Sequence, residues 1–190
     1  MEDKKFNPIN KKKLNNPQRL KFIPIERIAD ILNITKDGNI ADYGAGTGYF
    51  TFRIADFFPK SRIFALDIEE QMINEMIQNA ECENVFPLQI EDNEMPFAKD
   101  DLVAVFSIAV YHEMKTPSKW LKNVHKTLKP GAKLLIIDWS QDQNPDIEIG
   151  PPLSHRIKTD AVINDLKLSG FKNIVLEDGF THHFAISAEK

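Results

Sequence analysis

The stretch Ile40–Phe50, which reads IADYGAGTGYF, constrains the fold more than any other part of the chain. Short apolar residues come first, an acid follows, and glycines then occupy positions Gly44, Gly46 and Gly48. Apolar residues at helical spacing come next, so the pattern predicts a strand, a tight turn and a helix. Glycines in such a turn permit positive φ and let a ligand approach the backbone, where the first N–H groups of the helix can bind it.

The spacing of these glycines separates the ligand classes that use such turns. A dinucleotide fingerprint requires G-x-G-x-x-G/A, but Tyr49 fills the place of the third small residue. A Walker loop requires a lysine after its last glycine, and the sequence has none there. Asp42 would repel a phosphate and would suit a ligand with an amine or a positive charge. A plain structural turn remains the alternative to a ligand site.

The segment DYGAGTG resembles the first motif of the class I S-adenosylmethionine-dependent methyltransferases. It is most similar to the small, cap-free members that are like quinone-biosynthesis methyltransferases. The resemblance implies a Rossmann-like, doubly wound α/β fold with a seven-stranded mixed sheet, mostly parallel with an antiparallel last strand, and helices on both faces. It also implies S-adenosylmethionine as the cofactor, S-adenosylhomocysteine as the product, and cofactor contacts from Asp42, Gly44, Gly46 and Gly48.

The composition of the chain narrows the remaining classes. A hydrophobic content of 42% over 190 residues is typical of a soluble globular protein, and the net charge of −4 argues against nucleic-acid binding. No apolar run is long enough to span a membrane, and the start MEDKKFN lacks the apolar core of a signal peptide. The single cysteine, Cys82, rules out an internal disulfide. We therefore expect a cytoplasmic protein.

The chain divides into a basic N-terminal arm, residues 1–24, and a single methyltransferase-like domain, residues 25–190. Residues 1–21 carry seven Lys or Arg against two acids. Two alternatives stay open for this arm. It is either a solvated terminal segment or a basic flap that covers the ligand cleft or contacts an anion.

The second predicted strand, Arg62–Asp67, ends in an acid. A carboxylate at that place can accept hydrogen bonds from both hydroxyls of a ribose, so Asp67 is a predicted cofactor contact. A helix-capping or solvated acid is the alternative. Ile68 and Met72 would line the adenosine, as their equivalents do in the family, although methionine in a helical stripe is more often part of the core.

The third predicted strand, Val85–Ile90, runs into EDNEMPF, which resembles the acidic turn of the family. Glu91 matches the acid of the family best, and Asp92 lies beside it. One of the two would accept a hydrogen bond from the adenine amino group. A turn that is acidic because it is solvated is the alternative.

The fourth predicted strand, Leu102–Ser107, is a nearly continuous apolar run, as expected of a central parallel strand. Ligands bind outside the carboxyl ends of such strands, at the switch point in strand order. Ser107 is therefore a predicted cofactor contact and Tyr111 a predicted acceptor contact. His112 or Glu113 could act as general base if the acceptor arrives protonated, unless these are only polar residues at a helix start.

Further acceptor contacts are predicted at Trp139, at the end of the fifth strand, and at His155 and Arg156. Residues 140–158 form a long, polar, proline-bearing segment, which is typical of a functional lid or of an ordinary solvated loop. Arg156 would clamp an anionic group.

Three functions compete on this sequence. The first is a methyltransferase for a small-molecule acceptor, with no nucleic-acid partner. The second is a non-catalytic S-adenosylmethionine-binding protein or partner subunit, and the third is a nucleotide-dependent oxidoreductase on a similar fold. We expect no metal site, because alternation along a strand would point His182 and His183 to opposite faces. The acceptor and the oligomeric state stay open.

Overall fold

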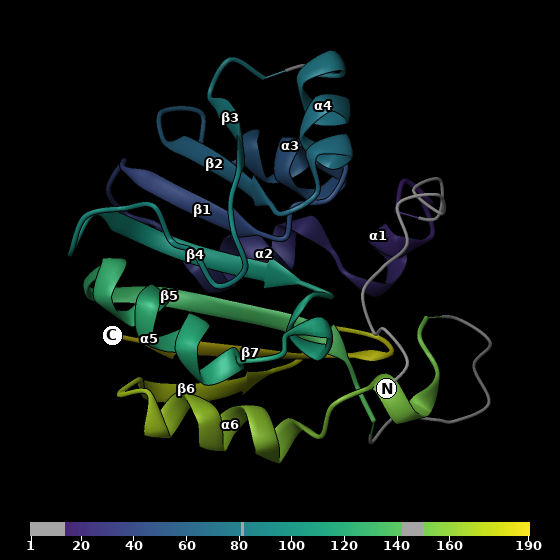
Figure 1. Ribbon diagram of the computed structural model, residues 1–190, viewed down its shortest axis with the longest axis vertical. Helices are drawn as coiled ribbons and strands as arrows, with labels where there is room; N and C mark the ends of the chain where they lie inside the picture. Colours follow the sequence, from purple (N-terminus) through teal and green to yellow (C-terminus); the bar gives the residue numbers. More distant parts are fainter. Residues whose placement is uncertain (1–13, 81, 142–149) are drawn as a thin grey trace.

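The computed structural model describes residues 14–80, 82–141 and 150–190 (Figure 1). Within these residues, seven strands form one sheet in the order β3-β2-β1-β4-β5-β7-β6. Neighbouring strands are parallel except where β7 pairs with β5 and β6, so the predicted Rossmann-like sheet with an antiparallel last strand is confirmed. The strands are β1 (Asn39–Tyr43), β2 (Arg62–Asp67), β3 (Val85–Gln89), β4 (Leu102–Ile108), β5 (Leu128–Trp139), β6 (Lys172–Glu177) and β7 (His183–Glu189).

Helices cover both faces of this sheet, as predicted. The buried side chains of α2, α3 and α4 join one core cluster, and those of α5 and α6 join a second cluster on the other face. In Figure 1, α5 and α6 lie in front of the sheet and α2 lies behind it. The helices are α1 (Arg19–Phe22), α2 (Ile25–Leu32), α3 (Tyr49–Ala55), α4 (Glu70–Gln78), α5 (Pro117–Thr127) and α6 (Thr159–Leu168), with short 3₁₀ helices η2 (Tyr111–Glu113) and η3 (Leu153–His155). No helix in the described ranges is long and apolar enough to cross a membrane.

The chain leaves the two central strands in opposite directions across the sheet. From β1 it continues outward to β2 and β3, whereas from β4 it continues to β5 on the other side. Every residue of β4 from Ala104 to Ile108 is buried, as its apolar sequence predicts. Because the crossovers diverge here, their loops leave a crevice at the carboxyl ends of β1 and β4.

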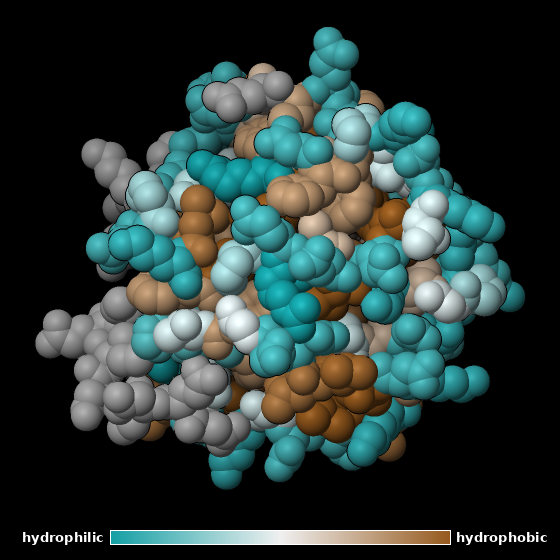
Figure 2. Space-filling model, turned by 180° about the vertical axis from the view of Figure 1, so that it is seen from behind, coloured by the Kyte–Doolittle hydropathy of each residue, from teal (hydrophilic) through white to brown (hydrophobic). Residues whose placement is uncertain are grey.

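The edge strand β6 exposes apolar side chains instead of burying them. Val175 and Leu176 are 48% and 58% exposed, and Leu168 of α6 is 75% exposed. Figure 2, which views the molecule from behind, shows apolar residues gathered in its lower part, where β6 lies in Figure 1. This edge therefore adds less to the hydrophobic core than the central strands do.

Three local features depart from simple sequence rules. The Lys-Pro-Gly segment at 129–131 lies within β5, which begins at Leu128 because Leu128 pairs with Leu102 ahead of a register shift. Thr159 is the first residue of α6, so the cap position falls to Lys158. His182 precedes β7 with a φ of 68°, so strand alternation does not govern its direction.

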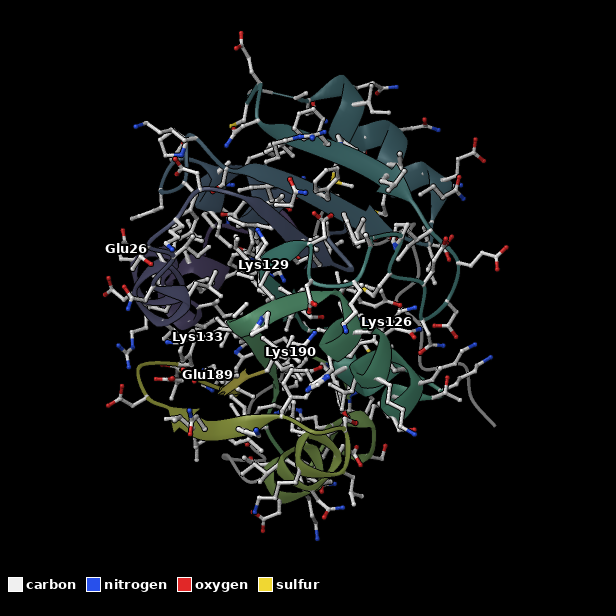
Figure 3. All side chains as sticks on the ribbon, turned by 90° about the vertical axis from the view of Figure 1, so that its left-hand side faces the viewer. Glu26, Lys126, Lys129, Lys133, Glu189 and Lys190 are labelled. Carbon is white, nitrogen blue, oxygen red and sulfur yellow. The ribbon has the colours of Figure 1, made fainter. Side chains whose placement is uncertain are left out.

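Lysine side chains tie the amino-terminal end of the central strands to neighbouring elements (Figure 3). The Lys190 ammonium donates to the Asp100 carboxylate at 2.6 Å and to the carbonyl of Lys126 at 3.2 Å. The Lys133 ammonium donates at 2.8 Å to the carbonyl of Ile31, in the last turn of α2. This end of the sheet lies opposite the crevice. The Lys133 and Lys190 ammonium groups there are held by internal contacts.

The described part of the N-terminal arm packs against the domain. Ile23 is 1% exposed, and the carbonyl of Phe22 accepts a hydrogen bond of 3.1 Å from the N–H of Thr181. Phe22 and Ile23 therefore pack on the domain, whereas residues 15–18 and 21 are exposed, and both alternatives for the arm stay open. The boundary at residue 24 stays a prediction, and residues 1–13 lie outside the described residues.

The glycine turn permits a direct test of this packing. Gly44 and Gly131 have nearly the same φ, 77° and 75°, but an added Cβ would lie 2.4 Å from Val110 at Gly44 and would meet nothing within 4 Å at Gly131. Gly131→Ala should lower the free energy of unfolding by roughly 1–2 kcal/mol, from backbone strain alone. Gly44→Ala should cost at least about 1–3 kcal/mol more, because Val110 is β-branched and stiff. Urea unfolding of both variants measures the difference, and equal losses would contradict the close packing.

Candidate functional site

A cavity of about 730 Å³ opens at the carboxyl ends of β1, β2 and β4. It occupies the crevice expected at the switch point of an open α/β sheet. The predicted site residues that line it are Asp42, Gly44, Gly46, Asp67, Ile68, Met72, Asp92, His112, Glu113, Trp139 and His155. Within the described ranges, the predicted site residues that do not line it are Gly48, Glu91, Ser107, Tyr111 and Arg156.

The glycine turn is fixed to the neighbouring strand by backbone hydrogen bonds. The N–H groups of Gly44 and Ala45 donate to the carbonyl of Leu66 at 2.8 and 2.9 Å. The N–H of Gly46 donates to the carboxylate of Asp67 at 2.8 Å. The turn after β1 and the acid that ends β2 therefore form one unit, which faces the cavity.

Asp67 is held in one orientation at the cavity wall. Its second oxygen accepts a hydrogen bond of 2.9 Å from the N–H of Glu69, the residue that precedes α4. Burial raises the pKa of Asp67, while the N–H groups of Glu69 and Gly46 lower it. A carboxylate offers about four acceptor positions, so two backbone contacts leave capacity for a ligand hydroxyl.

Asp42 lies at the end of β1, beneath the same turn. It is 2% exposed, and its carboxylate accepts a hydrogen bond of 2.5 Å from the hydroxyl of Thr51 in α3. Burial raises the pKa of Asp42 to about 7. A carboxylate in this position favours a cation beside it, because the cation would offset the loss of water.

The acidic turn after β3 presents a different acid from the one expected. Asp92 lines the cavity, whereas Glu91 is exposed outside it. The next residue, Asn93, has a φ of 63°, and its N–H donates at 2.9 Å to the hydroxyl of Tyr43. This bond anchors the turn on β1. The match to the family motif, which favoured Glu91, uses only neighbouring residues and so could not take this bond into account.

Two further predicted cofactor contacts have structural roles. The hydroxyl of Ser107 donates at 2.9 Å to the carbonyl of Tyr43 and so joins β4 to β1. Gly48 precedes α3 with a φ of 76°, and a Cβ there would lie 2.6 Å from Phe52 and 3.0 Å from Met76. Gly48 thus allows α3 to pack closely, and neither Gly48 nor Ser107 lines the cavity. Their contacts with the cofactor stay predictions.

His112 forms a buried dyad with Asp138, a residue to which the sequence assigned no role. The His112 Nδ1 lies 2.7 Å from one Asp138 oxygen, and the His112 backbone N–H donates to the other at 2.9 Å. Asp138 is fully buried and also accepts from the N–H of Trp139 at 2.6 Å. An ionised Asp138 places the His112 proton on Nδ1, which leaves Nε2 for the cavity, 3.6 Å from the Glu113 carboxylate.

Tyr111 points away from the cavity, although it precedes the dyad directly. Its hydroxyl donates to the Asp165 carboxylate at 2.8 Å, and its ring centroid lies 6.1 Å from that of Trp120. Tyr111 is 2% exposed within the core cluster under α5 and α6. Tyr111 therefore does not line the cavity, and its contact with the acceptor stays a prediction.

The acceptor end of the cavity differs from the prediction in its charge. Arg156 is buried behind Trp139, with its guanidinium 5.4 Å from the Trp139 ring centroid and its Nε donating to the carbonyl of Pro151 at 3.1 Å. The His183 ring lies 4.1 Å from that of Trp139 and lines the cavity instead. Arg156 thus packs against Trp139 and does not line the cavity, and its role as an anion clamp stays a prediction.

His183 makes this part of the wall neutral. Burial lowers its pKa to about 4, and its Nδ1 lies 2.9 Å from the carbonyl of Thr181. Because the ring carries no charge near neutral pH, the wall beside Trp139 suits an uncharged part of a ligand.

Several cavity residues come from parts of the chain that the sequence did not assign to the site. They are Leu14, Asn16, Gln18, Arg19 and Phe22 of the arm, Tyr49 and Phe50 of α3, Met114 and His183. The basic character of the arm was the only signal for its contribution. Phe50 and His183 line the cavity because of how their elements pack, and no local sequence signal indicates this.

A family model described as a methyltransferase domain matches residues 34–179. The chain belongs to this family. The predicted resemblance is therefore confirmed, and the matched range includes the glycine turn, the acids after β2 and β3, and the dyad.

This methyltransferase domain is similar to proteins with different acceptors. It is 33% identical over 113 residues to the ubiquinone/menaquinone biosynthesis C-methyltransferase UbiE of Wigglesworthia glossinidia brevipalpis. This match covers 55% of this chain and 44% of that protein. It is 26% identical over 133 residues to the tRNA U34 carboxymethyltransferase of Campylobacter curvus, and this match covers 68% of this chain and 44% of that protein. The matches thus span less than half the length of these curated relatives.

A solved structure matches the domain over nearly all of both chains. A SAM-dependent methyltransferase from Aquifex aeolicus superposes with a TM-score of 0.87 at 25% identity, and the match covers 97% of this chain and 98% of that one. The arrangement of elements around the cavity is therefore shared with a methyltransferase of the same size.

The buried carboxyl of Asp42 predicts a measurable dependence of stability on pH. Between the ordinary aspartate value of 3.8 and about 7, the unfolded chain loses this proton while the folded chain keeps it. Asp42 therefore lowers the free energy of unfolding as pH rises through this window, by up to roughly 1.4 kcal/mol per pH unit. In Asp42→Asn this loss is absent, so the variant should gain stability relative to wild type from pH 4 to pH 7, by a total on the order of 4 kcal/mol.

Urea unfolding of both proteins without ligand, at several pH values, measures this difference. His183 acts in the opposite direction, because its lowered pKa of about 4 makes stability rise with pH up to its ordinary value of 6.5. The difference between variant and wild type cancels the His183 contribution. Parallel pH curves for the two proteins would show that Asp42 is not desolvated.

Proposed function

We propose that this protein transfers a methyl group from S-adenosylmethionine to a small-molecule acceptor. The unit formed by the glycine turn and Asp67 carries the proposal, because Gly46 holds the carboxylate where a ribose would meet the turn. Family membership and the similarity to the Aquifex aeolicus methyltransferase support the same cofactor.

The residues around the cavity fit the parts of this cofactor. Asp67 would accept hydrogen bonds from the ribose hydroxyls, and Asp92 one from the adenine amino group. Ile68 and Met72 would cover the faces of the adenosine with apolar surface. Asp42 would lie beside the amino group of the methionine part, at the end of the cofactor away from the adenine. When bound, the cofactor supplies an electrophilic methyl group on a positively charged sulfur.

The His112–Asp138 dyad would prepare the acceptor. A thiol, phenol, enol or amine that arrives protonated must lose its proton as it attacks, and the His112 Nε2 would take it. Buried Asp138 would hold the imidazole in the required tautomer and stabilise the cation that forms. Glu113 lies 3.6 Å from this nitrogen and would add to that stabilisation. We therefore assign His112 as the base and Asp138 as a positioning residue.

The composition of the site favours a small acceptor over a nucleic acid. One relative acts on tRNA by its name, but the net charge of this chain is −4, which gives little attraction for a phosphate backbone. Trp139 and the neutral ring of His183 also present largely apolar surface to the cavity. The non-catalytic alternative remains testable, since turnover with any acceptor would remove it.

Calorimetric titration tests the cofactor site directly. S-adenosylhomocysteine should bind wild-type protein with micromolar affinity, and Asp67→Ala should lose at least about tenfold, because it removes two ligand hydrogen bonds worth roughly 0.5–1.5 kcal/mol each. The exposed acid Asp56 provides the control, and Asp56→Ala should bind like wild type. No binding by folded wild-type protein would refute the proposal, and binding of NADH instead would favour an oxidoreductase.

Transfer of a tritiated methyl group to a panel of phenols, thiols, amines and enolisable carbonyls tests the dyad. His112→Gln should reduce turnover by roughly 10²–10⁴-fold, the usual contribution of a general base. Asp138→Asn should do the same, because its amide would donate to Nδ1 and place the imidazole proton on Nε2. Affinity for S-adenosylhomocysteine should stay within about twofold in both variants. His125→Gln, outside the cavity, is the control, and undiminished turnover in both dyad variants would exclude a base at this position.

A further inference from the structure

A row of exposed lysines follows α5, the helix in front of the sheet in Figure 1. Successive members are four and three residues apart in alternation, so those inside α5 share one side of the helix and the other two flank it in the sequence. We call this set the lysine row: Lys115, Lys119, Lys122, Lys126 and Lys129. Residues 114–137 contain six lysines and no acid, although the net charge of the chain is −4.

The lysine row weakens the helix that carries it. Side chains three or four residues apart are neighbours on a helix, and like charges at that spacing are destabilising. Lys119 also lies in the first turn of α5, where the helix dipole disfavours a cation. The helices α2, α4 and α6 each carry an acid in the first turn, whereas α5 carries none. Helix stability therefore does not explain the row, and departures from local rules are typical of functional surfaces.

The positive charge of the row is not compensated within the described part of the chain. The ion pairs between described residues include none of its members. Acids on the neighbouring elements make other contacts. Asp100 binds the ammonium of Lys190, and Asp165 of α6 accepts a hydrogen bond from the Tyr111 hydroxyl. The row therefore attracts an anionic partner.

We propose that the lysine row docks the acidic surface of a different protein. Lysine lacks the flat fork with which arginine binds phosphates. The described side chains between the members of the row include no exposed aromatic ring on which a nucleic-acid base could stack. The row is also short, because the 11 residues of α5 span about 16 Å. A compact acidic patch on a protein matches that length.

Acids beside the row limit the extent of this partner. Residues 67–98 contain nine acids and no Lys or Arg. The turn at 91–94 lies against α5, because the Asn123 Nδ2 donates to the carbonyl of Asn93 at 2.9 Å. A nucleic-acid backbone or a membrane extends past the row and would be repelled by these acids. The same repulsion would fix the position of a compact acidic patch on α5.

The row begins beside the cavity. Lys115 directly follows Met114, which lines the cavity together with His112 and Glu113. A protein docked along α5 would therefore lie next to the site of the proposed reaction.

Two labelled helical peptides of equal length and composition test the docking surface by fluorescence anisotropy. One carries glutamates at alternating intervals of three and four residues, and the other spreads the same glutamates around the helix. Wild-type protein should bind the patterned peptide at least about fivefold more tightly than the spread one, and added salt should weaken that binding.

Two double variants locate the binding. Lys119→Glu/Lys126→Glu should weaken the patterned peptide at least about tenfold, because it reverses two charges of the row. Lys36→Glu/Lys60→Glu makes the same change in net charge at exposed positions outside the row, and should bind within about twofold of wild type. Lys119→Glu places an acid in the first turn of α5, which favours the helix, and circular dichroism confirms that both variants are folded.

The outcomes decide between an acidic protein and the other anionic partners. Equal affinity for the two peptides, or equal losses in the two double variants, would show that binding follows net charge alone and would overturn the proposal. Tighter binding of a DNA duplex or of phosphatidylserine vesicles would overturn it as well. Self-association that Lys119→Glu/Lys126→Glu abolishes would assign the row to a second copy of this chain instead. Patterned binding that requires the row supports the proposal, and none of these measurements depends on the proposed function.

Discussion

The hydrogen bond between the Gly46 N–H and the Asp67 carboxylate joins the two parts of the proposed cofactor site. It connects the turn after β1 to the end of β2, and the two bonds to the Leu66 carbonyl fix the same turn along the strand. Positive φ at Gly44 and Gly46 makes these contacts possible, because only glycine adopts that conformation without strain. The other cavity residues lie around this unit.

The cavity walls hold their charges in two different ways. Asp138 accepts three hydrogen bonds from His112 and Trp139, so that carboxylate is satisfied before any ligand arrives. Asp42, by contrast, is buried and accepts a single hydrogen bond among the described residues, from the Thr51 hydroxyl. Preorganised groups suit catalysis, since they need no rearrangement as the reaction proceeds. Groups that await a partner suit binding, since the ligand restores what burial removed.

Local motifs predicted the cavity lining better than residues that only follow a strand. The glycine turn and Asp67 are local motifs at the ends of predicted strands, and both lie at the cavity. The motif match favoured Glu91 over Asp92, but the turn is set by the bond from Asn93 to Tyr43, which joins residues distant in sequence. Tyr111 and Arg156 lie outside the lining for a similar reason, because a residue next to a cavity along the chain can face the core behind it.

The sequence by itself determined the class of fold and the family. Apolar periodicity and glycine spacing are local, and a parallel sheet with a switch point places every strand end on one edge. Only the tertiary structure decided which side chains meet there. The arm lies over the turn, Asp138 of β5 reaches His112, and His183 of β7, rather than Arg156, lines the cavity next to Trp139. These contacts depend on packing between elements far apart in the chain, and no local pattern records that packing.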